Sequence, residues 1–353
     1  MYPALSVLQA LGSKAQPVLW VGGKGGMEAD LIQRAGIPFA SIPAAGLHGI
    51  GLGALPRNLA QLAQGTLASR RILAKFKPDV LFFTGGFIAA PMAVADRGIP
   101  TLLYVPDIEP GSALKFLARN ATKIALTAPE SKAYFNDSAR LVVTGYPTRA
   151  ELAHWDKAEG RKKLGLRDDL PVLLVLGGSK GARSINRGLL PVLPQLLKLA
   201  QVVHLSGQLD WEEVQAVQAQ LPTDLAKDYH AYPYLHEEMG AALASADLAI
   251  SRAGASTMGE YPLFGLPAIL VPYPHAWRYQ KVNADYLVNH DCAVMVKDEE
   301  LPLQLLGTVQ GLLGNPMQLD SMHKAMRALY QPEAANRIAS LLEELAQKKE
   351  GNS

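Results

Sequence analysis

One stretch, 246–283, limits more than any other how this chain can fold. A short apolar run at 248–251 leads through a loop of small residues into a helix that opens at Ser256, and a second apolar run follows at 268–271. This order of strand, tight loop, helix and strand places backbone N–H groups at a helix start, where a phosphate can bind. Glu260 lies one turn into the helix, and a carboxylate there can accept hydrogen bonds from two neighbouring hydroxyls. The stretch therefore predicts a pocket for a phosphate and a ribose.

The same alternation of short apolar runs and longer amphipathic segments continues along the chain, as is typical of parallel sheets covered by helices on both faces. A turn at 145–147 and a polar segment at 151–167 interrupt it, and it restarts at 172–176. Because 353 residues favour two domains, we predict an α/β protein of two tandem, doubly wound, Rossmann-like domains. Such folds bind ligands at the carboxyl ends of their strands, so we expect the ligand cleft between the domains.

The expected domains are 1–147 and 148–330. Residues 331–353 are expected to form a final helix that packs back on the first domain, followed by a tail. The predicted strands are 18–21, 39–42, 79–84, 101–105, 123–127 and 141–144 in the first domain, and 172–176, 201–205, 229–232, 248–251 and 268–271 in the second.

Composition argues against several classes of protein. The formal net charge is only +2, which does not favour an electrostatic nucleic-acid binder. The single cysteine, Cys292, excludes a disulfide framework, indicates a reducing compartment and is expected to be buried. The sequence has no apolar run of about 20 residues and no basic start typical of a signal peptide. We expect a soluble, cytoplasmic protein, or one attached to a membrane surface.

A glycine-rich loop at 177–181, Gly-Gly-Ser-Lys-Gly, follows the strand at 172–176 and precedes a helix. Glycines let a phosphate approach the backbone closely, and the helix start favours its charge. The loop matches neither the P-loop nor the dinucleotide pattern, so a structural tight turn is the alternative. A similar loop at 22–26 fits a surface turn equally well.

Charged residues near strand ends in the first domain are candidates for chemistry. Asp107 and Glu109 follow the strand at 101–105, and Arg149 follows the turn at 145–147. Solvated loop charges are the alternative interpretation. The histidines show no metal-ligand spacing, so we expect no metal site.

An apolar, glycine-rich loop leads into a helix with basic residues. This combination suits an anionic membrane surface, and a loop packed on its own helix is the alternative. The residues concerned are Leu47, Ile50, Leu52 and Leu55, followed by Arg57, Arg70 and Arg71.

These motifs together resemble the MurG glycosyltransferases. The second half carries LGGSKGARSIN at 176–186, SRAGASTMGE at 251–260, GLPAILVPYP at 265–274 and YQKVNA at 279–284. Weaker matches in the first half are MEADL at 27–31, KPDVLFFTGGF at 77–87 and TGYPTR at 144–149. The resemblance implies a GT-B fold, with the acceptor held by the first domain and the UDP-sugar by the second. It also implies transfer of N-acetylglucosamine from UDP-GlcNAc to the undecaprenyl-linked MurNAc-pentapeptide precursor of peptidoglycan, by a peripheral enzyme on the cytoplasmic face of the cell membrane, without a cofactor.

The resemblance further implies roles for individual residues. Ser179 and the loop glycines would contact diphosphate, with Arg149 nearby. Glu260 would bind the ribose hydroxyls, and Gln280 and Asn283 would face the sugar. The full set implied to bind UDP-GlcNAc is Arg149, Gly178, Ser179, Gly181, Leu235, Ala255, Ser256, Thr257, Glu260, Gln280 and Asn283.

The sequence departs from the family pattern on the acceptor side. The family begins with a strand and a glycine-rich loop ending in His, whereas this sequence starts at the helix that follows them, so we expect that strand and loop to be missing. Either the start is misassigned or the variant is real. The family's His-Glu-Gln-Asn reads Tyr-Val-Pro-Asp at 104–107.

These departures leave the catalytic base and the acceptor open. We expect an inverting transfer in which Asp107 or Glu109 serves as general base. The alternatives are a related transferase that glycosylates another lipid, such as diacylglycerol, and a non-catalytic nucleotide-sugar-binding subunit.

Overall fold

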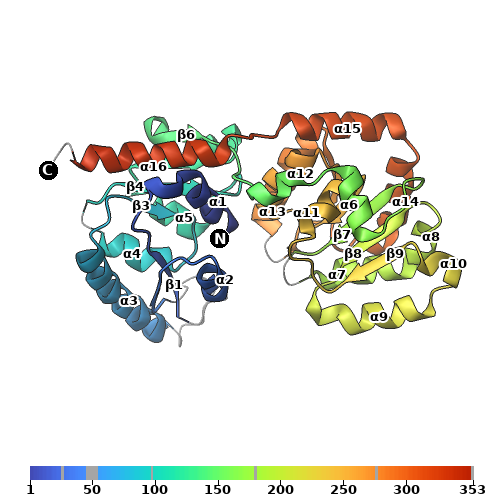
Figure 1. The fold of residues 1–353 in the computed structure, drawn as a ribbon, viewed down its shortest axis with the longest axis horizontal. Helices are drawn as coiled ribbons and strands as arrows, with labels where there is room; N and C mark the ends of the chain where they lie inside the picture. The colour runs from blue at the N-terminus through green and yellow to red at the C-terminus, as the bar shows by residue number, and fades with distance from the viewer. Residues whose placement is uncertain (25–27, 45–54, 97, 179–180, 275–276, 351–353) are drawn as a thin grey trace. The chain divides into compact units, whose positions relative to one another are not determined.

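The computed structural model describes residues 1–24, 28–44, 55–96, 98–178, 181–274 and 277–350. The chain forms two compact units (Figure 1). The first comprises Met1–Pro106, Pro110–Pro147 and Glu333–Ser353, and the second comprises Asp107–Glu109 and Thr148–Pro332.

In its described residues the first unit has two parallel sheets. Strands β1 and β2 pair in one, and β3, β4, β5 and β6 follow one another in the other. The five residues of β4 are all buried, as expected for an apolar strand covered on both faces. The strands are β1 Trp20–Gly23, β2 Phe39–Ile42, β3 Leu81–Phe83, β4 Thr101–Val105, β5 Lys123–Leu126 and β6 Leu141–Val143.

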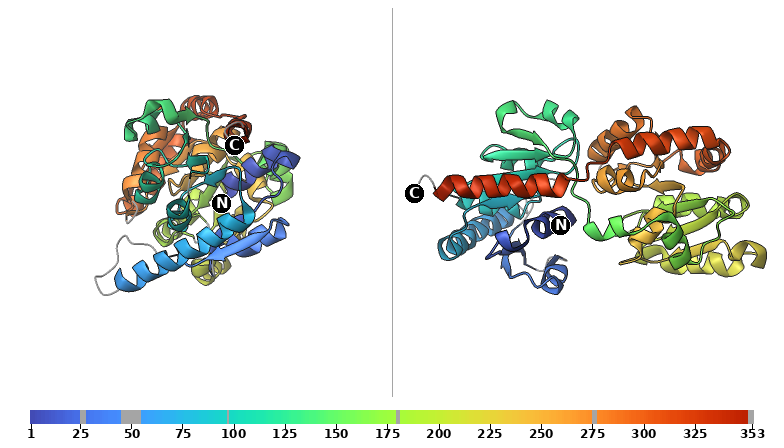
Figure 2. Two further views of the ribbon diagram at one scale, coloured as in Figure 1. Left: turned by 90° about the vertical axis from the view of Figure 1, so that its left-hand side faces the viewer. Right: turned by 45° about the horizontal axis from the view of Figure 1, so that its top comes forward.

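Helices from both ends of the chain meet in this unit. The final helix α16 packs along α1 and also contacts β4 (Figure 2), and Lys14 Nζ lies 3.0 Å from Glu343 Oε1. The long helix α3 packs on α4. The helices are α1 Tyr2–Leu11, α2 Glu28–Arg34, α3 Leu55–Phe76, α4 Ala89–Ala95, α5 Ser112–Leu117 and α16 Ala334–Glu350, with short 3₁₀ turns η1 Gly12–Lys14, η3 Pro129–Tyr134 and η4 Ser138–Arg140.

The second unit has one six-stranded parallel sheet in the order β12-β11-β10-β7-β8-β9. Renumbered within the unit, this is the doubly wound order 6-5-4-1-2-3, which reverses between β7 and β10. Ligands bind such sheets at the carboxyl ends of the strands at this reversal. The strands are β7 Val172–Leu176, β8 Gln201–Leu205, β9 Tyr229–Tyr232, β10 Leu248–Ser251, β11 Ala268–Leu270 and β12 Ala293–Met295.

Helices cover this sheet and enclose an aliphatic core that joins β7, β8 and β10 to α7 and α14. Helix α12 starts after β10 and ends at Gly265, whose φ of 64° closes it in the left-handed region. The helices are α6 Lys157–Leu164, α7 Arg183–Leu189, α8 Leu193–Leu196, α9 Trp211–Gln220, α10 Thr223–Ala226, α11 Met239–Ser245, α12 Thr257–Phe264, α13 Trp277–Asn289, α14 Leu301–Leu313 and α15 Pro316–Ala328, with 3₁₀ turns η5 Ala150–His154, η6 Leu190–Val192 and η7 Gln208–Asp210.

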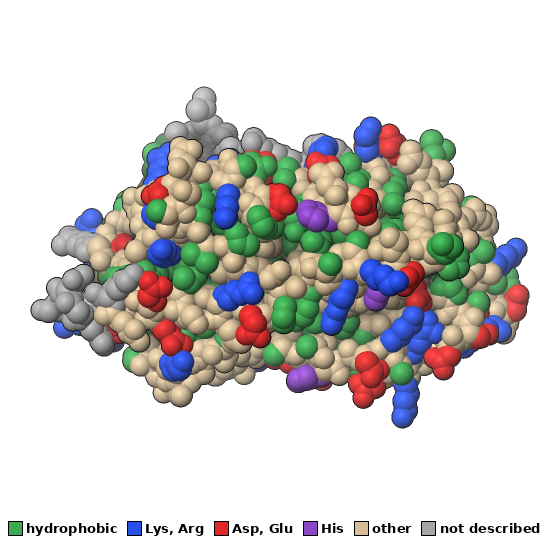
Figure 3. Space-filling model, turned by 90° about the horizontal axis from the view of Figure 1, so that it is seen from above, with side chains coloured by type: hydrophobic (Ala, Val, Ile, Leu, Met, Phe, Trp, Pro, Cys, Tyr) green, Lys and Arg blue, Asp and Glu red, His purple; other side chains and the backbone are tan. Residues whose placement is uncertain are grey.

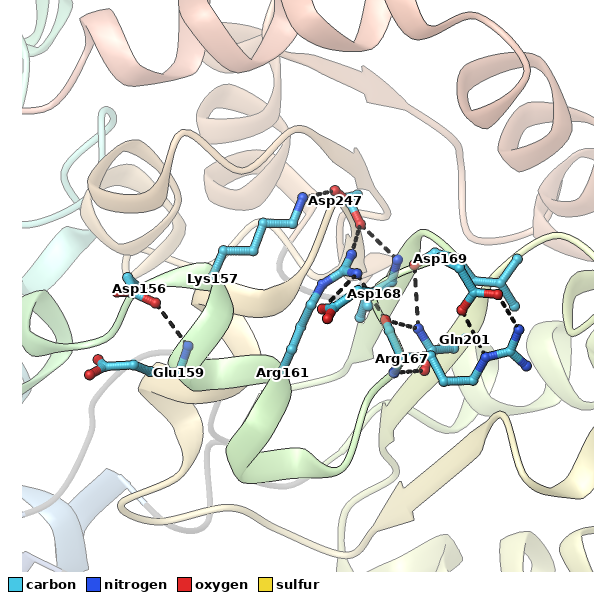
Figure 4. Close-up of polar contacts among 11 residues, drawn as sticks. Asp156, Lys157, Glu159, Arg161, Arg167, Asp168, Asp169, Gln201 and Asp247 are labelled. Atoms are coloured by element: carbon cyan, nitrogen blue, oxygen red, sulfur yellow. Dashed lines mark hydrogen bonds and ion pairs between the residues drawn. The ribbon is translucent and has the colours of Figure 1, made fainter.

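A polar cluster ties α6 to the amino ends of β7 and β10 (Figure 4). Asp247 accepts hydrogen bonds from Lys157 Nζ at 2.5 Å, Arg161 Nη2 at 3.0 Å and the Val172 amide at 2.8 Å. Arg161 is buried, so this carboxylate offsets the cost of enclosing its charge. Because the cluster lies at the opposite ends of the strands from the reversal site, we read it as structural.

The sheets confirm the predicted α/β class and most of the predicted strands. Strand β12, Ala293–Met295, was not predicted. It follows soon after helix α13, and in the described residues it pairs with β11. Cys292 is buried, as predicted, and burial raises the pKa of its thiol to about 12. On the face shown in Figure 3, acidic and basic side chains are interspersed.

Candidate functional site

A cavity of about 1020 Å³ opens in the second unit, where Leu176 ends β7 and Ser251 ends β10. It therefore lies at the reversal of strand order, as predicted for a doubly wound sheet. Its volume is at the upper end of the range typical of small-molecule sites. The predicted site residues that line it are Gly178, Gly181, Ser256, Thr257, Glu260 and Gln280.

The glycine-rich loop after β7 forms one wall of this cavity. Gly178 has φ 85° and Gly181 has φ 74°, a conformation that L side chains rarely adopt. A Cβ at Gly181 would also come within 2.2 Å of the Ser206 carbonyl oxygen. Both positions therefore need glycine, so no side chain projects from either of them. Ser179 lies outside the described residues.

Helix α12 forms the facing wall. Ser256 is its N-cap residue, and the Thr257 hydroxyl donates to the Gly254 carbonyl at 2.7 Å. Glu260 lies on the first turn and lines the cavity, and Arg149 Nη2 donates to its Oε1 at 3.2 Å. Burial raises the pKa of Glu260, and the neighbouring guanidinium of Arg149 acts in the opposite direction.

Helix α13 contributes two predicted residues that behave differently. Gln280 lines the cavity, and its Oε1 accepts from the Tyr273 amide at 2.8 Å. Asn283 is fully buried and is not among the described lining residues. Its Oδ1 accepts from the Ile108 amide at 3.0 Å, and its Nδ2 donates to Asp107 Oδ1 at 2.8 Å. The amide of Asn283 is thus committed to protein partners.

Asn283 holds one of the candidate bases beside the loop that follows β10. The Asn283 Nδ2 that holds Asp107 also donates to the Ala253 carbonyl at 3.1 Å, in the loop that follows β10. Asp107 is half-buried; burial raises the pKa of its carboxyl, and the Asn283 hydrogen bond opposes that rise. Glu109 is buried, with only 3% of its surface exposed.

The remaining predicted residues are not among the described lining of the cavity. Leu235 is buried a few residues after β9. Ala255 is half-buried between Gly254 and Ser256, which both line the cavity. Arg149 reaches Glu260 from outside the lining set.

Sequence reasoning missed Arg252, which lines the cavity immediately after β10. It donates to Asp298 Oδ1 at 2.5 Å and to the Ser184 hydroxyl at 2.6 Å, and its guanidinium lies 5.2 Å from the centre of the Tyr273 ring. The sequence signal was an arginine between a buried strand and a small-residue loop. The partners that fix it are distant in sequence, so only the fold reveals the group.

A chain of polar groups, also missed, starts at the cavity, which Arg183 and Asp210 line, and continues through the buried Asn186, His204 and Tyr229. Arg183 Nε donates to Asp210 Oδ1 at 2.8 Å, and Asn186 Nδ2 donates to Asp210 Oδ2 at 2.9 Å. Asn186 Oδ1 is therefore the acceptor for His204 Nε2 at 2.9 Å, and His204 Nδ1 must accept from the Tyr229 hydroxyl at 2.8 Å. Burial lowers the pKa of His204 to about 3, so its ring is neutral.

The membrane-facing residues predicted from the sequence are only partly described. Leu47, Ile50 and Leu52 lie outside the described residues, and of Leu55 only the backbone is described. Helix α3 presents exposed Arg57, Arg70 and Arg71 and contains no acidic residue. Across the described residues, every helix is too short or too polar to cross a bilayer.

Comparisons with known proteins identify the family. Residues 1–126 match the Glycosyltransferase family 28 N-terminal domain, and residues 172–342 match the Glycosyltransferase family 28 C-terminal domain. A curated relative from Roseiflexus sp. (strain RS-1) is 41% identical, over 93% of this chain and 83% of the relative. It is described as UDP-N-acetylglucosamine--N-acetylmuramyl-(pentapeptide) pyrophosphoryl-undecaprenol N-acetylglucosamine transferase. The crystal structure of Acinetobacter baumannii MurG matches with a TM-score of 0.76 at 28% identity, over 97% of this chain and 95% of that one.

The chain belongs to the MurG family. A second MurG-family relative of the same description, from Desulforudis audaxviator (strain MP104C), is 36% identical, over 99% of this chain and 96% of the relative. These matches confirm the predicted family and the two-domain GT-B fold. They place the glycine-rich loop and α12 of this MurG-family chain inside the matched C-terminal domain.

Proposed function

We propose that this chain transfers N-acetylglucosamine from UDP-GlcNAc to the undecaprenyl-linked MurNAc-pentapeptide precursor of peptidoglycan, converting lipid I to lipid II. Relatives that carry this activity in their description match nearly the full length of the chain. The observation in the structure that carries the proposal is the cavity at the strand reversal, which combines the glycines Gly178 and Gly181 with a carboxylate on α12. We assign the donor to the second unit and the acceptor to the first.

The donor fits the cavity by the chemistry of its walls. The loop at 177–181 offers backbone groups without side chains at Gly178 and Gly181, which suits a diphosphate. Glu260 is an acceptor for the two ribose hydroxyls, and Gln280 has an amide for the hydroxyls of the sugar. We place Ser256 and Thr257 beside the phosphate and ribose, and Leu235 beside the uracil.

The reaction is an inverting displacement. The 4-hydroxyl oxygen of the acceptor sugar forms a bond to the anomeric carbon of N-acetylglucosamine, the bond from that carbon to the diphosphate breaks, and UDP leaves with the electron pair. A general base takes the proton from the hydroxyl. We assign Asp107 to this task, because Asn283 holds it beside the loop that follows β10 and because burial raises its pKa toward the range where a base is effective. Glu109 is the second candidate.

Because the acceptor carries a lipid, we further propose that the chain binds peripherally to the cytoplasmic face of the membrane through helix α3 and the loop before it. The exposed arginines Arg57, Arg70 and Arg71 support this, as does the lack of acidic residues on the helix. Leu59 and Leu67 add exposed apolar surface to the same helix, at 48% and 54%. Basic residues beside apolar ones suit an anionic bilayer.

The experiment that tests the function supplies labelled UDP-GlcNAc and a lipid I analogue to the purified chain and follows the label into lipid. Parallel reactions use diacylglycerol as acceptor and UDP-galactose as donor. We expect label only from UDP-GlcNAc and only in the lipid I product. Transfer to diacylglycerol alone would replace the acceptor assignment, and UDP binding without transfer to either lipid would mean that the chain is a nucleotide-sugar-binding subunit.

A further inference from the structure

Arg149 and Glu260 form an ion pair that spans 111 residues of sequence. Arg149 precedes the turn η5, with an extended backbone at φ −64° and ψ 131°, and its Nη2 lies 3.2 Å from Glu260 Oε1. The two side chains are only 20% and 15% exposed. Exposed ion pairs contribute little to stability because water screens them. In a pair as shielded as this one, the charge of the arginine affects the ionisation of the carboxylate.

The two members of the pair stand in different relations to the donor cavity. Glu260 lines the cavity, whereas Arg149 is not among the described residues that do. Within the part of the chain that the structure describes, Arg149 is also the only side chain that bonds to the Glu260 carboxylate. A ligand in the cavity can therefore contact Glu260 directly. Arg149 can act on that ligand through its ion pair with Glu260.

The ion pair counteracts the effect of burial on the Glu260 carboxylate at the proposed ribose site. A carboxylate accepts hydrogen bonds from both ribose hydroxyls well only when it is charged, because hydrogen bonds to a charged acceptor are stronger than neutral ones. Burial favours the neutral acid and raises the pKa of Glu260, while Arg149 opposes that effect. Without the cation, the same helix position would present a weaker acceptor.

We infer that Arg149 is a positioning residue that acts through Glu260: it holds this carboxylate in place as a charged acceptor, and so sets the preference of the donor site for a ribonucleotide over a 2′-deoxyribonucleotide. The inference rests on the proposed function and deepens it, since it names the part of the donor that Arg149 governs. It differs from the family-based expectation that Arg149 lies near the diphosphate, because it assigns the arginine to the ribose end of the nucleotide.

The test measures the binding of three ligands by titration calorimetry: UDP, 2′-deoxyuridine diphosphate and uridine. The ratio of UDP to deoxy-UDP affinity reports the ribose contact, and the ratio of UDP to uridine affinity reports the diphosphate contact. The proteins are wild type, Arg149→Met, Arg149→Lys and Glu260→Gln. Arg167→Met is the control, because it breaks arginine–carboxylate pairs with Asp169 at 2.6 Å and Asp228 at 3.2 Å in the same unit but away from the cavity.

For wild type we expect UDP to bind about tenfold or more tightly than deoxy-UDP, from one charged hydrogen bond. Arg149→Met and Glu260→Gln should both reduce this preference to about threefold or less. The double variant should lose no more than either single one, because both changes remove the same interaction. Arg149→Lys keeps the charge and should retain most of the preference, and Arg167→Met should retain all of it.

A pH series separates this effect from simple damage to the fold. Arg149→Met removes the cation that opposes the rise in the pKa of Glu260, so its carboxyl should ionise at a higher pH than in wild type, and the preference for UDP should recover as the pH rises. The same recovery in wild type should be complete at a lower pH. A fold defect would lower the binding of all three ligands together and would not recover in this way.

Two outcomes would overturn the inference. One is an unchanged UDP to deoxy-UDP ratio in Arg149→Met together with a collapsed UDP to uridine ratio, which would assign the arginine to the diphosphate. The other is loss of the ribose preference in Arg149→Lys as complete as in Arg149→Met. Failure of wild type to bind UDP at all would contradict the proposed function itself, and is therefore distinct from both.

Discussion

Asn283 illustrates how a residue near a binding site can serve it indirectly. The family resemblance implied that it faces the sugar, and in the structure both atoms of its amide bond to protein groups around Asp107 and Ala253. A buried amide that makes all these bonds is costly to replace, because each partner would lose a hydrogen bond. We therefore expect Asn283 to affect turnover by holding Asp107.

Replacing the candidate base should separate chemistry from binding. In Asp107→Asn we expect turnover to fall about 100-fold or more, since general bases contribute about that factor, while UDP affinity changes less than about threefold. Burial raises the pKa of Asp107, so wild-type turnover should fall as the pH drops through that raised value and protonates the base. Steady-state rates and UDP binding, measured from pH 5 to 9, check this.

The matched variant for this experiment is Glu109→Gln, which changes the other nearby carboxylate. If Glu109→Gln loses turnover and Asp107→Asn keeps it, the base is Glu109. If neither substitution lowers turnover, both assignments are wrong.

His204 should make stability depend on pH. Burial lowers the pKa of this histidine to about 3 from its ordinary value of 6.5. Between these values the unfolded chain binds a proton that the folded chain does not, so folding free energy is lost at about 1.4 kcal/mol per pH unit as the pH falls below 6.5. Above that value the histidine is neutral in both states and adds no pH dependence.

The measurement compares urea unfolding of wild type and His204→Gln at pH 7 and pH 5. Glutamine cannot titrate, so the stability advantage of wild type should shrink by about 1–2 kcal/mol between the two conditions. Parallel losses in the two proteins would show that His204 is not the group responsible.

At the scale of elements, the loop between β7 and α7 is shaped by backbone conformation. Gly181→Ala would place a Cβ at φ 74° and within 2.2 Å of the Ser206 oxygen, so the loop must shift. We expect UDP affinity to fall about tenfold or more, because the loop backbone that faces the diphosphate moves, and unfolding free energy to fall by about 1–3 kcal/mol. Calorimetric titration and urea unfolding measure the two effects.

The control for this substitution is Gly307→Ala, inside α14. A Cβ there meets no atom within 4 Å, and the backbone is helical. Alanine should therefore leave UDP binding unchanged and raise unfolding free energy by about 0.5–1 kcal/mol. Equal UDP affinity in Gly181→Ala and wild type would argue against a diphosphate at this loop.

At the scale of the whole molecule, membrane attachment should depend on the charge of α3. Reversing three exposed cations on this helix should weaken binding to vesicles that contain phosphatidylglycerol by about 100-fold or more, since each basic residue contributes about 1 kcal/mol at such a surface. Binding to phosphatidylcholine vesicles should be weak for all proteins. The variant carries Arg57→Glu, Arg70→Glu and Arg71→Glu, and its control carries Lys162→Glu, Lys198→Glu and Lys227→Glu.

Co-sedimentation at physiological salt measures this difference, and transfer to a detergent-solubilised acceptor should remain intact in both variants. Equal loss in the control would mean that net charge and not the α3 surface governs attachment. Equal binding of the α3 variant and wild type would contradict the proposed membrane surface.

The sequence by itself determined the parallel α/β architecture, the loops that follow β7 and β10, and the candidate site residues on or just after them. These features are local: apolar runs set the strands, glycines set the turns, and a helix that starts after a strand points its first turn at the sheet end. Gly178, Gly181, Thr257 and Glu260 could therefore be predicted as residues of the candidate site from short segments.

The tertiary structure alone decided which distant groups meet. It paired Glu260 with Arg149, placed Asp107 against Asn283, and enclosed Arg252 between groups that no spacing in the sequence connects. It also added β12, which was not predicted from the sequence and which pairs with β11. The physical reason is the same in each case: burial and pairing set the charge and orientation of a side chain, and both depend on what the fold brings near it.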